Sequence, residues 1–164
     1  MGEERELTLR PIGRVARGRP WPDDGERCEQ NEERTADIEL DDPWEDALDG
    51  IEGFSHVWVV WWIDRSGGPP ETMVVHPEGR PEMPLVGLLA TRSPRRPNPV
   101  GITAVRLLER KGTRLCVEGL DAFEGTPVLD IKPYLRRGDL IPDATDPEWL
   151  QQLWQTHDEE LSEA

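Results

Sequence analysis

The sequence predicts a mainly β protein, a small antiparallel β-barrel-like domain of about seven strands with one or two short helices. Three observations lead to this prediction. Short segments rich in β-branched and aromatic residues are separated by turns rich in glycine and proline. No β–helix–β rhythm runs through the chain, and the turn at residues 110–113 is flanked by alternating segments, as in a hairpin. With 164 residues, the chain is long enough for one domain with a real core.

The first two predicted strands lie near the start of the chain. Residues 7–15 form the first, with a bulge expected at Pro11 or Gly13, where a ladder donor or a side chain is missing. Residues 36–40 alternate between apolar and polar side chains and form the second.

A short helical segment and a long apolar strand come next. Residues 43–48 predict one or two helical turns, with Asp42 as the cap and Pro43 at the first position. Residues 54–63 are apolar almost throughout, so we expect both faces of this strand to be covered. Its His56 is interpreted as a core or interface histidine rather than a catalytic one.

The second half contains the remaining predicted strands. After a long irregular connection over residues 64–83, these strands occupy residues 85–90, 100–109, 114–120 and 128–132. A C-terminal helix begins at Asp146 and Pro147, with an apolar face formed by Trp149, Leu150, Leu153 and Trp154. The acidic tail from His157 is expected to fray.

Charge divides the sequence sharply. The whole chain carries a net charge of −15, and residues 23–52 contain fourteen acidic and two basic residues. Residues 83–117 contain seven basic residues and one acidic residue, so a polyanionic partner would have to meet this positive island. The acidic excess fits solubility or adaptation to high salt. Lys111 and Lys132 are the only lysines, which fits either a halophile or a GC-rich genome.

Several protein classes are not indicated. The sequence has no GxGxxG opening a helix after a strand, no Walker loop, no GxSxG elbow and no His/Cys metal cluster, so no metal is expected. It also has no apolar signal segment and no membrane-length apolar run. Cys28 and Cys116 form no motif, and Cys116 is expected to be a buried thiol. We therefore expect a reducing, cytoplasmic location and no membrane.

The most informative segment is the basic, proline-rich run at residues 90–101. Three prolines within residues 94–99 fix the backbone and remove three donors, so the loop is expected to be stiff. It holds three guanidinium groups, whose planar forks suit a carboxylate or another anion. The alternative is a surface loop that only joins two strands.

Four blocks together resemble one family. They are LDGIEGFSHVW at residues 48–58, VGLLATRSP at 86–94, RPNPVG at 96–101 and GTPVLDIKPY at 125–134, and PIGRV at 11–15 fits the first strand. In this order they identify the chain as similar to the TsaA-like/TrmO tRNA methyltransferases. The resemblance covers residues 7–139, and it implies a β-barrel methyltransferase domain over residues 1–140, followed by a short helix and acidic tail over 141–164.

The resemblance also implies ligands and partners. Its members bind S-adenosylmethionine, usually as homodimers with the cofactor near the interface. Characterised members methylate N6 of threonylcarbamoyladenosine, next to the anticodon of tRNA. By matching motifs, the cofactor-binding residues are expected to be Asp64, Arg65, Arg92, Ser93, Ile102, Leu120, Asp121, Ala122 and Phe123. The expected tRNA-binding residues are Trp21, Arg95, Arg96, Asn98 and Lys132.

Elementary chemistry is compatible with methyl transfer. An in-line approach to a sulfonium methyl needs positioning rather than a metal or a covalent nucleophile. Arg92 could pair with the carboxylate of the cofactor or with the threonyl carboxylate of the base. Asp121 or Asp130 could accept from the cofactor's ammonium or ribose, or either could be a turn or strand-end carboxylate. Three residues are the catalytic candidates, the last two as weak bases: Arg92, Asp64 and Tyr134.

The tryptophans allow two interpretations. Trp58, Trp61 and Trp62 share one predicted strand and are assigned to the core or to a dimer interface. Trp21, in a loop, is the better candidate for stacking on a base.

The chain departs from the family at some positions. Longer bacterial members often have His-Gln where Asp64 and Arg65 stand, and their early Pro-Arg-Gln segment has only Arg19-Pro20-Trp21 as its nearest equivalent. Two alternatives therefore remain beside the tRNA enzyme. One is the same methyl transfer to another substrate, and the other is a non-catalytic module that binds S-adenosylmethionine or a nucleotide.

Overall fold

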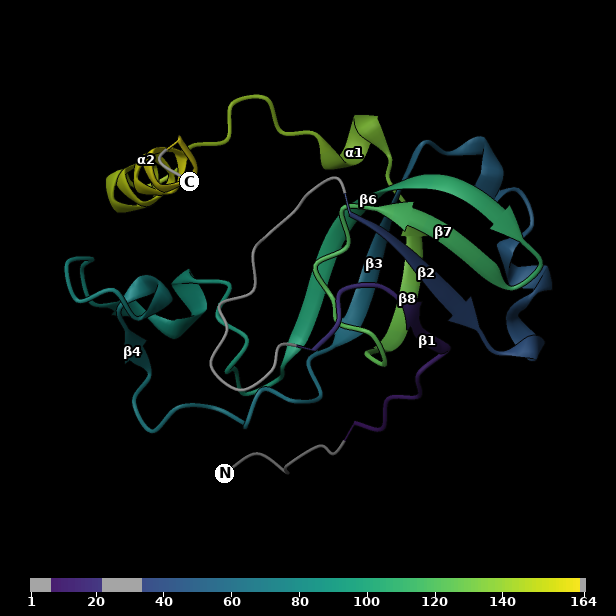
Figure 1. Cartoon of the computed structure of the whole chain (residues 1–164), viewed down its shortest axis with the longest axis horizontal. Helices are drawn as coiled ribbons and strands as arrows, with labels where there is room; N and C mark the ends of the chain where they lie inside the picture. Colours follow the sequence, from purple (N-terminus) through teal and green to yellow (C-terminus); the bar gives the residue numbers. More distant parts are fainter. Residues whose placement is uncertain (1–6, 22–33, 163–164) are drawn as a thin grey trace. The chain divides into compact units, whose positions relative to one another are not determined.

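Six strands form a closed antiparallel barrel in the computed structural model, which describes residues 7–21 and 34–162 (Figure 1). Around the barrel the order is β1, β2, β7, β6, β3 and β8, and β8 pairs back to β1. The bounds are Gly13–Arg17 for β1, Thr35–Leu40 for β2, His56–Trp62 for β3, Val100–Lys111 for β6, Arg114–Glu118 for β7 and Pro127–Pro133 for β8. The predicted mainly β, barrel-like fold is confirmed.

The barrel core is built from side chains that alternate along each strand. Val57 and Val59 of β3 are fully buried, as is Val105 of β6. The same cluster contains Val15, Ala36, Ile38, Leu40, Leu115, Val117 and Val128. The outward residues of β3, including Trp58 and Val60, keep part of their surface exposed. The expectation that both faces of this strand are covered is therefore only half right, because a barrel strand has one inner face.

The strands of the barrel are joined by pairings of unequal length. β3 and β6 pair at seven positions, from His56 with Arg106 to Trp62 with Val100. β1 and β8 pair at only two, Gly13 with Val128 and Arg14 with Pro127. The hairpin between β6 and β7 turns between Lys111 and Arg114, as predicted, with Gly112 at φ +59°.

Gly101 of β6 has a packing role. It lies opposite Trp61 of β3, and a Cβ at this position would overlap the Trp61 indole ring. The ring in turn donates from Nε1 to Thr103 Oγ1 at 3.1 Å. Glycine at 101 therefore lets Trp61 lie flat against the neighbouring strand.

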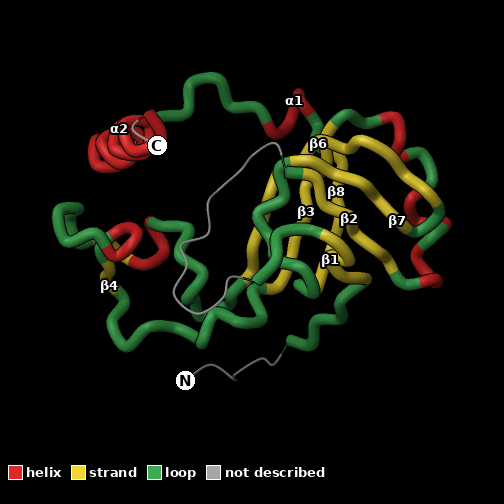
Figure 2. Tube along the Cα trace, viewed as in Figure 1, coloured by secondary structure: helices red, strands yellow, loops and turns green. Residues whose placement is uncertain are grey.

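Two predicted elements near the start of the chain are shifted in the structure. The first strand begins at Gly13, and its bulge lies between Val15 and Arg17 rather than at Pro11 or Gly13. The two helical turns are 3₁₀ turns, η1 (Asp42–Trp44) and η2 (Asp46–Leu48), and Asp41 takes the cap position instead of Asp42. A third, η3 (Ile51–Gly53), follows them (Figure 2).

The chain divides into two compact units. One comprises residues 1–66 and 98–134 and contains the barrel, and the other comprises residues 67–97 and 135–164. The predicted domain boundary at residue 140 stays a prediction.

The second unit has little strand. Its two-stranded sheet joins β4 (Val74–Val75) and β5 (Val86–Gly87), and a 3₁₀ turn, η4 (Pro77–Gly79), lies between them. The strand predicted at residues 85–90 therefore keeps two residues, because Leu88–Ala90 forms a 3₁₀ turn, η5. A short helix, α1 (Arg136–Asp139), was not predicted.

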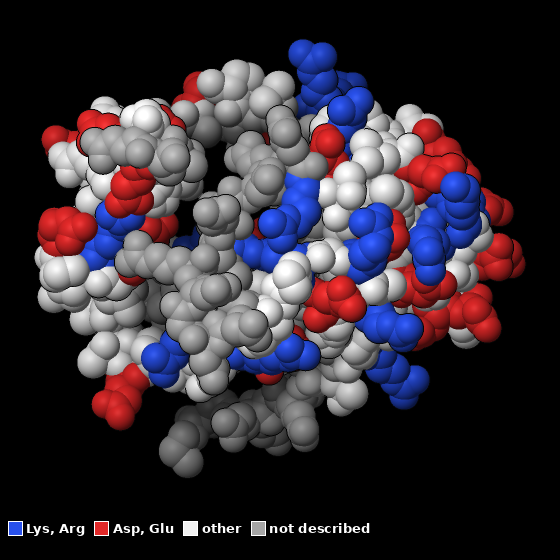
Figure 3. All heavy atoms as spheres, in the orientation of Figure 1, with Lys and Arg blue, Asp and Glu red and all other residues white. Residues whose placement is uncertain are grey.

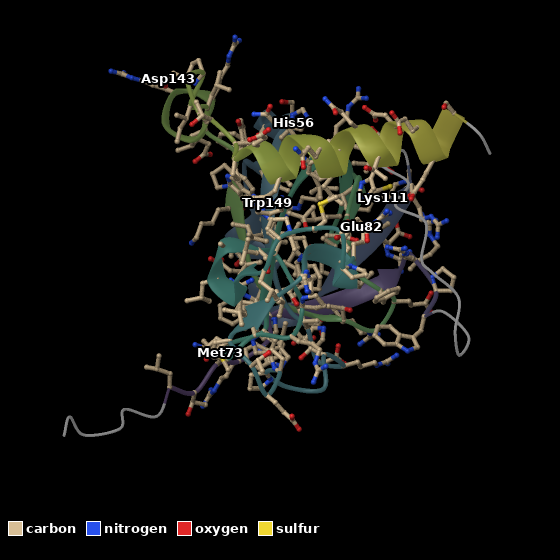
Figure 4. The ribbon with its side chains drawn as sticks, turned by 90° about the vertical axis from the view of Figure 1, so that its left-hand side faces the viewer. His56, Met73, Glu82, Lys111, Asp143 and Trp149 are labelled. Carbon is tan, nitrogen blue, oxygen red and sulfur yellow. The ribbon has the colours of Figure 1, made fainter. Side chains whose placement is uncertain are left out.

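The C-terminal helix is longer than expected. α2 (Glu148–Ser162) runs through His157, where fraying was predicted. Its last turns are held to the η4 segment, since Arg80 Nη2 donates to Glu160 at 2.9 Å and His157 Nε2 lies 2.9 Å from Glu78. Figure 4 shows the helix with Trp149 labelled near its start. Leu153 is buried beneath the helix, whereas Trp154 is half exposed.

Candidate functional site

Two aromatic rings and two guanidinium groups form a stack in the barrel unit. The Trp21 and Phe123 rings meet edge to face, with centroids 4.2 Å apart. The Arg65 guanidinium carbon lies 4.7 Å from the Trp21 centroid, and that of Arg19 lies 5.2 Å from the Phe123 centroid. We call these four residues the Arg–aromatic stack. It brings together three of the predicted site residues, Trp21, Arg65 and Phe123.

Backbone hydrogen bonds place the stack. Arg19 and Phe123 form an isolated parallel bridge, and the Glu124 N–H donates to the Arg19 carbonyl at 2.8 Å. Gly125, at φ +86°, turns the chain so that its N–H reaches the Val15 carbonyl at 2.9 Å. The loop after β1 is thereby fixed against the segment that precedes β8.

Arg19 is the buried member of the stack. Its side chain is 11% exposed, and Nη1 donates to Asp121 Oδ1 at 3.3 Å. Among the described residues, its Nη2 is buried without a hydrogen-bond acceptor. The adjacent face of Phe123 supplies a cation–π contact in place of an acceptor. Arg19 therefore contacts both Asp121 and Phe123 and fixes their positions.

Asp121 is the carboxylate of this site. Desolvation raises its pKa above the ordinary value, and the positive charge of Arg19 acts in the opposite direction. The side chain still keeps 59% of its surface exposed. A ligand that carries an ammonium or a hydroxyl donor can therefore reach it.

The neighbours of Asp121 in the chain are buried. Leu120 and Ala122 both belong to the hydrophobic core of the barrel. Ile102, also a predicted cofactor residue, lies on β6 opposite Val60 and is 50% exposed. It is a surface residue of the barrel wall.

Asp64 and Tyr134 lie at opposite ends of β3. Asp64 follows the strand, and its carboxylate lies 3.7 Å from Arg65 Nε. Tyr134 donates its backbone N–H to His56, the first residue of the strand, and its ring lies 5.6 Å from that of Trp58. Eight residues of extended chain span roughly 26 Å. Within one chain, the two predicted bases therefore do not share one site.

The tyrosine end carries its own polar residues. Lys132 pairs with Trp58 across the strands and forms an ion pair with Asp130 at 2.6 Å. His56 lies 6.4 Å from Tyr134 between ring centroids, and its Nδ1 is 2.9 Å from Ser55 Oγ. Asp130 is thus paired with a lysine, whereas Asp121 accepts a hydrogen bond from Arg19 of the Arg–aromatic stack.

The second unit contains the basic loop. Arg92 and Arg95 are exposed, and no hydrogen bond or ion pair of their side chains occurs within the described part of the chain. Arg96 is half-buried, and its Nη1 donates to the carbonyls of Thr91 at 2.7 Å and Ser93 at 3.4 Å. Asn98, in the barrel unit, is exposed and accepts the Val100 N–H on its carbonyl at 2.8 Å.

The predicted positive island is largely neutralised. Four of its seven basic residues form ion pairs with carboxylates: Arg106 with Glu118, Arg110 with Asp49 and Glu52, Lys111 with Glu109, and Arg114 with Glu39. Figure 3 accordingly shows blue and red atoms interspersed over much of the visible surface. Within this island, the loop arginines Arg92, Arg95 and Arg96 are the basic residues without a carboxylate partner among the described residues.

Sequence reasoning missed two arginines. Arg19 was named only as part of a loose family equivalent, although a basic residue beside Pro20 and Trp21 was a usable signal. Arg110 donates to the carbonyls of Leu48, Glu45 and Gly112 as well as to two carboxylates. Most of these partners lie 58 to 65 residues away in sequence, so no local pattern could reveal them.

The described residues contain neither a membrane-spanning helix nor a metal cluster. None of their helices has the length and apolar character needed to cross a bilayer. No group of three or more His, Cys, Asp or Glu residues among them could hold a metal ion. The predicted burial of Cys116 is only partial, and Cys28 lies outside the described residues.

Comparison with known families decides the assignment. Residues 20–140 match the model of the tRNA-methyltransferase O N-terminal domain. The chain belongs to this family. The tRNA-methyltransferase O match contains the whole Arg–aromatic stack except Arg19, together with the basic loop, Asp64 and Tyr134.

Relatives of different lengths share this domain. A protein of Archaeoglobus fulgidus named "Probable S-adenosyl-L-methionine-binding protein" is 46% identical over 110 residues, 67% of this chain and 29% of that protein. One of the same name from Methanothermobacter thermautotrophicus is 37% identical over 131 residues, 80% and 92% of the two chains. The human "tRNA (adenine(37)-N6)-methyltransferase" is 38% identical over 103 residues, 63% of this chain and 23% of the human protein.

A solved structure shares the fold. The crystal structure of TrmO from Pseudomonas aeruginosa superposes with a TM-score of 0.67 at 28% identity, covering 88% of this chain and 63% of that chain. This chain therefore spans less than two thirds of the TrmO structure and under a third of the longer Archaeoglobus relative.

Proposed function

We propose that this protein is an S-adenosylmethionine-dependent methyltransferase that methylates N6 of threonylcarbamoyladenosine next to the anticodon of tRNA. The supporting observation is the family match over residues 20–140. It is joined by a relative whose name specifies adenine 37 and N6. Residues 1–140 would form the methyltransferase domain, and residues 141–164 would add a helix and an acidic tail.

The Arg–aromatic stack and its neighbours fit S-adenosylmethionine. Asp121 offers an accessible carboxylate for a ligand ammonium or ribose hydroxyl, and the buried Leu120 and Ala122 flank it in the chain. When bound, the cofactor supplies a methyl group on a positively charged sulfur. The cofactor-binding set remains the one named from sequence, with Asp64, Arg65, Phe123, Arg92, Ser93 and Ile102 beside these three.

The protein's own contribution is positioning. Arg92 carries an exposed guanidinium that would pair with a carboxylate, either that of the cofactor or that of the threonyl group. A weak base suffices for an amide-like N6–H, and Asp64 is the candidate on the side of the Arg–aromatic stack. Tyr134, with Lys132 beside its strand, would belong to a tRNA-contacting surface at the other end of β3.

The tRNA-binding residues divide by their present partners. Arg95 and Asn98 are exposed and would approach phosphates or sugars. Trp21 is 42% exposed, and one face of its ring is covered by Arg65, so a stacked base would use the remaining surface or displace that arginine.

The first experiment is calorimetric titration of S-adenosylmethionine into wild-type protein, Asp121→Asn and Asp130→Asn. We expect Asp121→Asn to weaken binding about 10-fold or more, because a charge-assisted hydrogen bond is lost. Asp130→Asn should bind like wild type, since Lys132 already holds that carboxylate. Equal losses in both variants would contradict the placement of the cofactor at the Arg–aromatic stack.

A second assay separates the alternatives. Methyl transfer to tRNA that carries threonylcarbamoyladenosine, but not to unmodified tRNA, is the expected result. Cofactor binding without transfer to either RNA would favour another acceptor or a non-catalytic binding module. Absence of cofactor binding at both low and high salt would remove the methyltransferase proposal unless bound tRNA restored it.

We also propose a cytoplasmic homodimer. On the outer wall of the barrel, Val100 and Ile102 of β6 are exposed beside the half-buried Trp58, Val60 and Trp62 of β3. A second copy would cover this apolar wall. Sedimentation equilibrium should give twice the monomer mass of 18.7 kDa, and Ile102→Glu should return the monomer.

A further inference from the structure

The basic loop in the second unit has an internal order that its sequence does not reveal. Arg92, Arg95 and Arg96 are equivalent in charge, yet Arg92 and Arg95 project free guanidinium groups whereas Arg96 is half-buried. Arg96 Nη1 donates to the Thr91 carbonyl at 2.7 Å and to the Ser93 carbonyl at 3.4 Å. These two carbonyls flank Arg92 on both sides.

A second set of bonds closes the same turn. Thr91 Oγ1 donates to the Leu88 carbonyl at 2.8 Å and accepts the Ser93 N–H at 3.2 Å. Pro94 then fixes the backbone immediately after Ser93. Every peptide group next to Arg92 is therefore held, by the Arg96 guanidinium or by the Thr91 hydroxyl.

We propose that Arg96 is a positioning residue for Arg92 and makes no phosphate contact of its own. Arg96 is half-buried, and turning its guanidinium outward to an RNA phosphate would break the bonds that Nη1 makes to the Thr91 and Ser93 carbonyls. By keeping its bond to the Thr91 carbonyl, Arg96 holds Arg92 in one orientation. Arg92 can then bind the carboxylate of the cofactor or of the threonyl group. The step from Arg92 to a ligand rests on the proposed function, whereas the ordering of the loop does not.

The ordering is tested without any ligand. Amide hydrogen exchange at Ser93, followed by NMR, should become at least about 10-fold faster in Arg96→Gln, because the turn that protects this N–H loosens. Arg95→Gln is the matched control, and its Ser93 exchange should equal that of wild type. Unchanged Ser93 exchange in Arg96→Gln would overturn the proposal whether or not the protein is a methyltransferase.

The second test asks whether Arg96 contacts an RNA phosphate, and it measures how tRNA affinity depends on salt. Arg95→Gln should lower the slope of log affinity against log salt by about 1, as expected for a lost phosphate contact. Arg96→Gln should leave that slope unchanged while lowering kcat/KM about 10-fold. A slope reduced by about 1 in Arg96→Gln would show a direct phosphate contact and would refute the positioning role.

A double-mutant cycle excludes a merely structural effect. If Arg96 acts through Arg92, Arg92→Gln with Arg96→Gln should lose no more kcat/KM than Arg92→Gln alone. Arg96→Lys, which keeps one donor for the Thr91 carbonyl, should recover part of the loss. Fully additive losses in the double variant, or a lysine no better than glutamine, would contradict the proposal.

Discussion

At the scale of single residues, Asp37 on β2 is a buried carboxylate of the barrel. Arg17 donates to it bidentately, from Nε at 2.8 Å and from Nη2 at 3.1 Å. The Asp37 side chain is 13% exposed, whereas that of Arg17 is 58% exposed. The Arg17 hydrogen bonds hold the pKa of Asp37 below its ordinary value, against the desolvation that would raise it. Nearby Cys116 is affected in the opposite way, since burial raises the pKa of its thiol.

This lowered pKa predicts an acid-sensitive contribution to stability. Because the folded pKa lies below the unfolded value of about 3.9, the contribution is complete above that pH and disappears as the pH falls through the folded value. Asp37→Asn should be less stable than wild type at pH 7, and the difference should shrink toward pH 3. Urea unfolding at the two pH values measures this. Glu39→Gln, which breaks an exposed pair with Arg114, is the control and should change little. A pH-independent difference for Asp37→Asn would contradict the assignment.

The residues of the candidate site were predictable to different degrees. Phe123, Asp121, Arg65 and Trp21 were named from motif matching, and the structure places them around one stack. The split between Asp64 and Tyr134 was not predictable, because it depends on which end of β3 each residue follows. The sequence also could not tell which arginine of the basic loop bonds the backbone, because Arg95 and Arg96 are adjacent and chemically identical and only Arg96 reaches the Thr91 carbonyl.

At the scale of elements, sequence patterns located the strands that have long partners. Strands β2, β3, β6, β7 and β8 all overlap predicted segments, β2 from its alternation and β3 from its continuous apolar run. Residues 7–12 also alternate, but Leu7 and Leu9 are 83% and 57% exposed and pair with no strand. A strand depends on its neighbour as well as on its own pattern. The length of α2 was missed for the same reason, since its last turns are held by Glu78 and Arg80, far away in sequence.

Between β3 and β6 the packing predicts a specific sensitivity at Gly101. Gly101→Ala should destabilise the barrel by about 1–3 kcal/mol, because the added methyl overlaps the Trp61 ring and the wall must shift. Thermal or urea unfolding gives the value. Gly53→Ala is the matched control, because a Cβ there would meet nothing within 4 Å. A Gly101→Ala protein as stable as wild type would show that Trp61 moves aside at no cost.

At the scale of the whole molecule, charge is the dominant property. The net charge is −15, and most of the basic residues of the predicted island are already paired with carboxylates. Arg110 alone, 11% exposed, binds Asp49 and Glu52 and three backbone carbonyls, which ties the acidic 3₁₀ segment to the barrel. Ion pairs therefore attract neighbouring charges locally, while the excess of acidic residues repels over longer distances.

The salt dependence of stability should reveal whether ion pairing or charge repulsion dominates. Raising NaCl from 10 mM to 1 M shortens the screening length from about 30 Å to about 3 Å, so we expect repulsion to fall more than pairing and the melting temperature to rise. Each kcal/mol gained would raise it by about 2–4 °C. A parallel series in sodium sulfate separates screening from solute exclusion. A melting temperature that falls with NaCl would show that ion pairs such as those of Arg110 outweigh the repulsion.

The two-position pairing between β1 and β8 gives the barrel a weak seam. One of its four residues is Pro127, which has no N–H to donate. Backbone bonds from Ile12 to Val128, from Val15 to Thr126 and from Gly125 to Val15 extend the seam. If the barrel opens, we expect it to open between β1 and β8, and the edges of both strands then become exposed. An opened copy could accept a strand from another opened copy, so these few hydrogen bonds separate a closed monomeric barrel from strand-exchanged assemblies.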